Sequence, residues 1–278
     1  MLSNENTIIF HHIPKTAGTT FRSILERQYN VDNIYEIWGD KNLMIKNFKI
    51  IPQKDRFQYK LIYGHQALKL YDYVNKPVVI TMLRSPVDRI ISLYRYVKGF
   101  PWHPFYSTVN KYSLKECFQN EIFNDWTELC NGQFNSIKNS FNRTNLWQSN
   151  YDISTVQSMI DIFHKDILFG LVEFFDESLI YFNNYIGFTN HIYYYKQKLS
   201  RKIINIDEET IEMITQHNLL DIELYQTSVK AFNQMINSYK DSDSKQLERF
   251  IGINKYASIY LRNKDKIKFF FNNIYSDK

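Results

Sequence analysis

The chain contains few of the residues that build turns and cross-links. Among 278 residues there are 8 glycines, 6 prolines and 2 cysteines. Low glycine and proline contents argue against a turn-rich β-sandwich and against flexible linkers. Cys117 and Cys130 do not make a disulfide framework, and no His/Cys spacing matches a zinc site, so a reducing compartment is the simplest interpretation.

Long hydrophobic runs are also lacking. No stretch approaches the roughly 18 consecutive apolar residues that a membrane-spanning helix requires. The N-terminus lacks the basic and apolar regions of a signal peptide, and the apolar run 7–13 is too short to be one. We therefore expect a soluble, cytoplasmic protein without a membrane span.

The excess of positive charge is small. Lys and Arg total 34 against 29 Asp and Glu, which gives a net charge of +5. This excess fits an anionic small molecule or polymer, but it is too weak and too scattered to indicate nucleic-acid binding. A hydrophobic fraction of 44% and an aromatic fraction of 17% exclude a disordered chain.

The hydrophobic pattern has the strand–loop–helix rhythm of a parallel α/β sheet. It predicts strands at residues 7–13, 60–63, 77–83 and 167–173, with a further one at 192–195. It predicts helices at residues 20–29, 86–97, 176–185 and 219–236, and one that opens at residue 207. We therefore predict an α/β fold with a P-loop-like central parallel sheet flanked by helices.

The domain organisation follows from the same pattern. Residues 1–236 are predicted to form a single domain that contains an irregular helical insertion at about 99–160. Residues 237–278 are predicted to form a helical, basic C-terminal extension, because residues 254–278 hold six basic residues against two acidic ones. A basic face of this kind is more often solvated surface than a binding site.

The loop at residues 14–19 lies between the first predicted strand and its helix. Such a loop presents backbone N–H groups and the positive end of a helix to an anion. It differs from a Walker A loop: Gly-Thr-Thr stands at 18–20, Ile13 replaces the first glycine, and the lysine has moved forward to Lys15. Taken alone, the loop would be better interpreted as a structural turn.

The residues of this loop nevertheless carry a specific resemblance. Residues 12–21, His-Ile-Pro-Lys-Thr-Ala-Gly-Thr-Thr-Phe, resemble the 5′-phosphosulfate loop of the carbohydrate sulfotransferases, the group that includes heparan sulfate 2-O- and 6-O-sulfotransferases. The resemblance implies that the donor is 3′-phosphoadenosine 5′-phosphosulfate (PAPS), with PAP as the product. The loop residues it assigns to the donor are Pro14, Lys15, Thr16, Ala17, Gly18, Thr19 and Thr20.

Residues 81–95 are similar to the family's 3′-phosphate segment, in which an Arg and a Ser eight residues later hold the 3′-phosphate. Arg84 and Ser92 match that pair. A guanidinium at the carboxyl end of a strand is also a good phosphate ligand on physical grounds. The role of Ser92 rests on the resemblance alone, and without it Arg89 and Arg95 are as plausible as surface salt-bridge partners.

His65 follows the second predicted strand, and Gly64-His65 resembles the Gly-His that carries the family's catalytic base. Imidazole suits the removal of a hydroxyl proton at neutral pH. An isolated histidine at a strand end would be interpreted as structural, so this role depends on the other motifs. We interpret His11 and His12, which alternate across the first strand, mainly as packing or loop-shaping residues.

Two late segments, residues 169–179 and 218–225, also look like family segments. Four cations lie between them and are candidates for a loop that closes over the nucleotide: Lys196, Lys198, Arg201 and Lys202. A solvated charged loop is an equally good interpretation of these cations.

The sequence therefore predicts a sulfotransferase that moves a sulfonate group from PAPS to a hydroxyl, with Lys15 and His65 as catalytic residues and no metal. The acceptor is expected to be a carbohydrate, although a lipid, a peptide or a small metabolite stays open, as does the oligomeric state. The alternatives are a P-loop-type nucleotide-dependent phosphotransferase and a non-catalytic nucleotide-binding protein.

Overall fold

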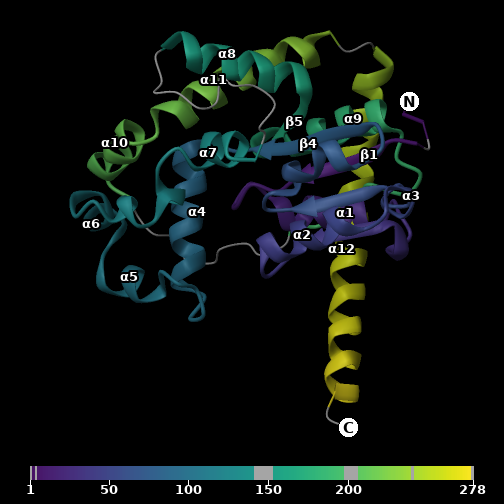
Figure 1. Ribbon diagram of the computed structural model, residues 1–278, viewed down its shortest axis with the longest axis horizontal. Helices are drawn as coiled ribbons and strands as arrows, with labels where there is room; N and C mark the ends of the chain where they lie inside the picture. The colour runs from purple at the N-terminus through teal and green to yellow at the C-terminus, as the bar shows by residue number, and fades with distance from the viewer. Residues whose placement is uncertain (1, 4, 141–152, 197–205, 239–240, 277–278) are drawn as a thin grey trace.

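A five-stranded parallel sheet forms the centre of the molecule (Figure 1). The computed structural model describes every residue except 1, 4, 141–152, 197–205, 239–240 and 277–278. The strands are β1 (Thr7–His11), β2 (Ile34–Ile37), β3 (Leu61–Gly64), β4 (Pro77–Leu83) and β5 (Ile167–Leu171), in the order β2-β3-β1-β4-β5. Every neighbouring pair runs parallel, so the predicted α/β class is confirmed.

Helices connect the strands and cover both faces of the sheet. In chain order the α-helices are α1 (Gly18–Glu26), α2 (Lys41–Ile50), α3 (Gln53–Arg56), α4 (Pro86–Lys98), α5 (Tyr106–Lys111), α6 (Leu114–Gln119), α7 (Gly132–Lys138), α8 (Ile153–Asp166), α9 (Phe175–Ile186), α10 (Glu208–Gln216), α11 (Leu219–Asn237) and α12 (Asp241–Ser276).

The central strands are apolar throughout because both of their faces are buried. All five residues of β1 are buried, and its side chains alternate between two cores. Ile9 packs in the core beneath α2, α7, α8 and α11, whereas Ile8 and Phe10 pack in the core beneath α1, α9 and the start of α12. The strand that carries the loop at residues 14–19 is therefore fixed from both sides.

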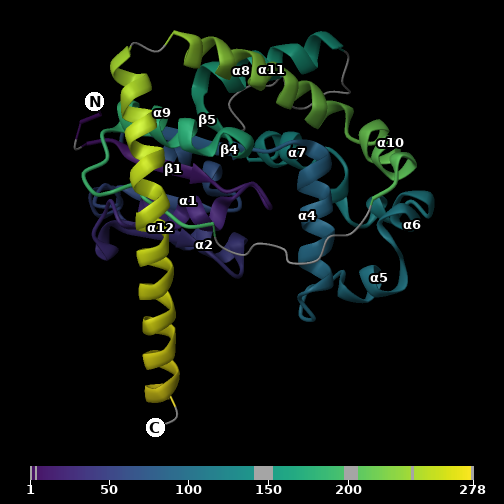
Figure 2. The ribbon, with the colours of Figure 1, turned by 180° about the vertical axis from the view of Figure 1, so that it is seen from behind.

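A third hydrophobic cluster lies beside the sheet, around α4. Its buried side chains come from α4, α5, α6 and α10, together with Leu129 and Trp126, which is 1% exposed. Figure 2 shows this lobe on one side of the sheet and α12 on the other, where α12 runs along the body and then extends well beyond it. Among the described helices, none is long and apolar enough to cross a membrane.

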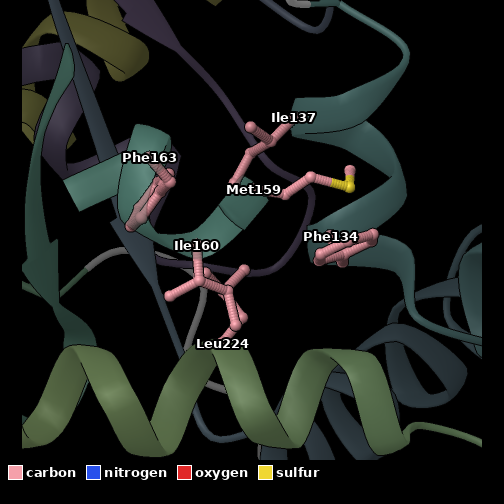
Figure 3. A pocket seen from close by; sticks show the side chains of 6 residues that line it. All are labelled: Phe134, Ile137, Met159, Ile160, Phe163 and Leu224. Carbon is pink, nitrogen blue, oxygen red and sulfur yellow. The ribbon is translucent and has the colours of Figure 1, made fainter. Parts of the chain in front are cut away.

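A small void lies where α7, α8 and α11 meet. Its volume is about 10 Å³, and Figure 3 shows the six apolar side chains around it, Phe134, Ile137, Met159, Ile160, Phe163 and Leu224. A void of this size with an apolar lining offers a water molecule no polar partners, so we interpret it as dry packing space rather than a ligand site.

The structure corrects three details of the predicted elements. β2 was not predicted, because only Ile37 of its four residues is buried and an edge strand of that kind has no clear hydrophobic alternation. β5 ends at Leu171, and a 3-10 turn takes up the last residues of the predicted strand. Helix α1 begins at Gly18, two residues earlier than predicted.

The predicted strand at residues 192–195 is not a strand. Ile192 and Tyr194 are buried, which explains the strand-like pattern, but side chains take up the backbone groups. Arg27 Nη2 donates to the Tyr193 carbonyl oxygen at 2.6 Å, and Tyr194 N donates to Asn254 Oδ1 at 2.8 Å. The division of the chain after residue 236 stays a prediction.

Candidate functional site

Three neighbouring strands end at the same edge of the sheet, and the predicted site residues follow them. His11 at the end of β1 pairs in register with Gly64 at the end of β3, and β4 lies on the other side of β1. The loop at residues 14–19, His65 and Arg84 are therefore brought together. The carboxyl edge of a parallel sheet, near a reversal of strand order, is where α/β folds bind their ligands.

The loop after β1 is shaped by two residues in the left-handed region. Lys15 has φ of 69° and Ala17 has φ of 58°, and Ala17 is the N-cap of α1. Alanine offers no side-chain acceptor, and the first turn of α1 contains no acidic residue. A bound anion is therefore the natural partner for the backbone N–H groups at the start of α1. The Thr16 hydroxyl does not belong to that set: it is buried and donates to the Ile13 carbonyl oxygen at 2.9 Å. Thr16 can therefore contribute only its backbone N–H.

Gly18 lies against the imidazole of His12. A Cβ atom built at Gly18 would be only 1.9 Å from His12 Nε2, so the loop and the histidine fit together only because residue 18 has no side chain. His12 thus shapes the start of α1.

We expect Gly18→Ala to destabilise the protein by about 1–3 kcal/mol, the usual cost of overpacking, and to weaken PAP binding because the loop must shift. The double variant Gly18→Ala/His12→Ala removes the clash and should regain most of the stability. Urea unfolding of the two variants measures this, and a single variant as stable as the wild type would contradict the contact.

His65 is held in one tautomer. Its Nδ1 lies 2.6 Å from the His12 carbonyl oxygen, which can only accept, so Nδ1 carries the proton and Nε2 of the neutral ring is left with a lone pair. The two imidazoles also stack, with ring centroids 4.6 Å apart. Gly64 makes this turn possible: its φ is 143°, and a Cβ there would lie 2.5 Å from the Ile37 carbonyl oxygen.

Burial lowers the pKa of His65 below its ordinary value, since the charged imidazolium loses hydration there. The hydrogen bond to His12 opposes this, the positive charge of Lys41 adds to it, and the carboxylate of Glu128 raises the pKa slightly. His65 is therefore neutral at neutral pH, and charges on α2 and on the insertion both reach it.

His11 has no access to this edge. It is fully buried, its Nε2 lies 3.0 Å from Ser136 Oγ, and burial lowers its pKa to about 3. A neutral, enclosed imidazole beneath α7 is a packing group, in line with its interpretation from the sequence.

Arg84 points at the loop from the end of β4. Its Nη1 donates to the Lys15 carbonyl oxygen at 3.3 Å. Lys15 in turn places its ammonium 4.2 Å from the ring centroid of Tyr96 on α4. Ser92 precedes Tyr96 by one helical turn and so shares that face of α4. The predicted 3′-phosphate residues and the loop therefore lie around one region.

Arg89 is not the surface salt-bridge partner that the sequence suggested. It is 1% exposed, its Nη2 lies 3.6 Å from Asp221 Oδ2, and it donates to the Glu128 carbonyl oxygen at 2.7 Å. The sequence could not show this, because its carboxylate partner comes from α11, more than a hundred residues further along the chain. The late segment 218–225 therefore has a structural partner in α4.

Three residues near the site were missed by sequence reasoning: Tyr96, Gln133 and Glu173. Tyr96 could have been found, since it lies four residues after Ser92 on the same helix face. Glu173 lies within a segment already singled out, but its target, the backbone N–H of Ser85, has no sequence signal. Gln133 lies within the irregular insertion, and nothing in the sequence marks it as a site residue.

The charged loop that was expected near the nucleotide is only partly described. Lys196 lines an open hollow of about 280 Å³ with Tyr194, Tyr195, Asn254, Ser258, Ile259 and Arg262. None of these lining residues comes from the ends of β1, β3 or β4. Lys198, Arg201 and Lys202 lie outside the described residues.

Comparison with known proteins agrees with this geometry. No curated protein matches the chain significantly. The sulfotransferase family matches residues 1–227, which is well over half of the chain and includes all of β1 to β5. The chain therefore belongs to the sulfotransferase family, and it is an enzyme that transfers a sulfonate group from PAPS to an acceptor.

Proposed function

We propose that this sulfotransferase acts on a hydroxyl group of a carbohydrate, with His65 as the base. The observation that carries the proposal is the hydrogen bond from His65 Nδ1 to the His12 carbonyl oxygen, which leaves Nε2 as the basic atom. The orientation of the base is thereby fixed by the backbone of His12, two residues before the loop.

The donor is proposed to lie between the loop and β4. The backbone N–H groups of residues 17–20 and the ammonium of Lys15 surround the 5′ end, and Arg84 and Ser92 take the 3′-phosphate. The cradle fits an anionic donor, because a helix N-terminus, an ammonium and a guanidinium converge there. When bound, PAPS supplies an activated sulfonate, and PAP is its leaving group.

In the proposed reaction His65 Nε2 accepts the proton of the acceptor hydroxyl. Its lowered pKa keeps the ring neutral and ready to accept that proton. Lys15 and the backbone N–H groups at the start of α1 then stabilise the negative charge that develops at the 5′ end of the donor. The stack on His12 keeps the imidazole from turning away.

Two residues that follow β2, Trp38 and Lys41, support a carbohydrate acceptor. Trp38 follows Ile37, the register partner of Gly64, and is 67% exposed. Lys41 is near enough for its charge to lower the pKa of His65. An exposed indole offers an apolar face to a sugar ring. The positive charge of Lys41 suits the acidic groups of an anionic sugar. The resemblance to carbohydrate sulfotransferases points the same way.

A screen of acceptors with sulfur-labelled PAPS tests the proposal. The panel contains desulfated glycosaminoglycans, neutral oligosaccharides, hydroxylated lipids and tyrosine-containing peptides, and His65→Gln serves as the inactive control. We expect label in the glycosaminoglycans. Label found only in the lipids or peptides would overturn the carbohydrate assignment while leaving the enzyme class intact.

The pH dependence follows from the direction of the His65 pKa shift. His65 acts as a base when neutral, and burial lowers its pKa, so activity should persist below the ordinary histidine value of about 6.5. We expect kcat/KM to fall only on the acidic side of that value, because kcat/KM reports groups of the free enzyme. An acidic limb centred at pH 7 or above would contradict a buried neutral base.

A further inference from the structure

Arg84 is held through its backbone by a single side chain. Gln133 Oε1 accepts from Arg84 N at 2.9 Å, and Gln133 Nε2 donates to the Arg84 carbonyl oxygen at 2.9 Å. Gln133 itself is completely buried. The primary amide thus pairs with both backbone groups of Arg84, as a neighbouring strand would.

Gln133 holds the backbone of Arg84 just beyond the end of the β-sheet pairing. The pairing of β4 with β5 ends at Leu83, one residue before Arg84, and α4 begins at Pro86. The backbone direction at Arg84 determines where its side chain leaves the chain. Because the Arg84 guanidinium reaches the Lys15 carbonyl oxygen at 3.3 Å, that direction also sets the distance between the guanidinium and the loop.

Gln133 is in turn fixed by α11. Asp221 Oδ2 accepts from Gln133 N at 3.1 Å, and Asp221 Oδ1 accepts from Phe134 N at 2.8 Å, so this carboxylate caps the start of α7. Arg89 pairs with Asp221 from α4, five residues after Arg84. These contacts link Arg84 to Gln133, and Asp221 back to Arg89, so they begin and end within residues 84–89.

A second side chain supports the adjacent residue. Glu173 Oε1 accepts from Ser85 N at 3.0 Å, and Glu173 Oε2 accepts from Tyr225 Oη at 2.7 Å. Tyr225 lies one helical turn after Asp221 on α11. The backbone N–H groups of Arg84 and Ser85 are therefore each hydrogen-bonded to a side chain, and both of the residues that supply these side chains in turn contact α11.

We propose that Gln133 is a positioning residue for recognition of the 3′-phosphate: its side-chain amide orients Arg84, while its backbone N–H is held by Asp221, so that the enzyme prefers 3′-phosphorylated nucleotides. The inference rests on the proposed function, in which Arg84 binds that phosphate. It adds a residue from the insertion, remote from every nucleotide motif, to the determinants of donor selectivity.

The test compares two nucleotides that differ only in the 3′-phosphate. Inhibition constants for PAP and AMP are measured against PAPS turnover. Gln133→Met keeps the side-chain volume but removes the amide. We expect the inhibition constant for PAP to rise about tenfold, the lower end of what losing a residue that orients a ligand-binding group costs. The inhibition constant for AMP should change less than about twofold. Equal weakening of PAP and AMP would show a general structural role and overturn the proposal.

Ile137→Ala is the matched control. Ile137 lies on the same helix, is 3% exposed and faces the apolar void, so its truncation loosens α7 without touching Arg84. We expect the PAP-to-AMP ratio of this variant to match the wild type. If Gln133→Met does not fold, the isosteric Gln133→Glu is measured in the same way, because it cannot donate to the Arg84 carbonyl oxygen; an unchanged ratio overturns the proposal.

Arg84→Ala separates this inference from the proposed function. It should remove most of the preference for PAP, and Gln133→Met should add nothing in that background, since the two changes act on one contact. If Arg84→Ala leaves the ratio unchanged, the assignment of Arg84 to the 3′-phosphate fails. If Arg84→Ala removes the preference but Gln133→Met retains it, only the role of Gln133 fails.

Discussion

Replacing His65 by alanine should reduce sulfonate transfer by roughly 100- to 10,000-fold, the range that a general base contributes. The donor residues are elsewhere, on the loop after β1 and at the end of β4, so PAP binding should change little. Steady-state turnover with labelled PAPS and calorimetric binding of PAP measure the two quantities separately.

His191→Ala is a suitable control for that experiment. His191 is exposed and stacks on Tyr193, away from the ends of the central strands. It should transfer sulfonate at the wild-type rate. A His65→Ala variant that binds PAP and turns over at the wild-type rate would show that another group takes the proton.

The second large effect is expected from Lys15→Ala. Removal of one preorganised donor to developing negative charge typically costs about 100- to 1,000-fold in kcat. The position of Lys15 supports this size of effect, because its backbone has φ of 69° and its ammonium rests on the Tyr96 ring beside the loop. The loss should appear in kcat more than in the affinity for PAP, and single-turnover kinetics separate the two.

The matched control is Lys98→Ala. Lys98 also lies over a tyrosine of α4, with its ammonium 5.6 Å from the Tyr94 ring, but it is exposed and lies in the last turn of the helix. It should leave turnover unchanged. Equal losses from both variants would mean that positive charge near α4, rather than a specific loop lysine, is what matters.

The fold was predictable where the physics is local. β1, β3 and β4 are short apolar runs that end in recognisable loops, and a strand buried on both faces needs nothing else to be identified. The loop at residues 14–19 and Arg84 could also be found, since each lies directly after such a strand. The sequence did not show that the Thr16 hydroxyl donates to the Ile13 carbonyl oxygen, so the donor-binding role predicted for Thr16 can involve only its backbone N–H.

What could not be predicted depends on contacts between distant parts of the chain. Arg89 looked like a surface residue because its partner, Asp221, is brought to it by α11 only after the domain has closed. Gln133 reaches Arg84 across 49 residues of sequence. The tautomer of His65 depends on a backbone carbonyl that becomes its neighbour only when β1 and β3 pair.

Selectivity for a 3′-phosphorylated nucleotide distinguishes a sulfotransferase from a nucleotide-dependent phosphotransferase. Thermal unfolding should be followed with PAP and with ADP, each with and without Mg²⁺. A ligand at 100 times its Kd stabilises the folded state by about 2.7 kcal/mol. We expect a rise in Tm with PAP that does not depend on Mg²⁺ and is much smaller in Arg84→Ala at the same PAP concentration. Stabilisation by ADP with Mg²⁺, and none by PAP, would contradict this expectation.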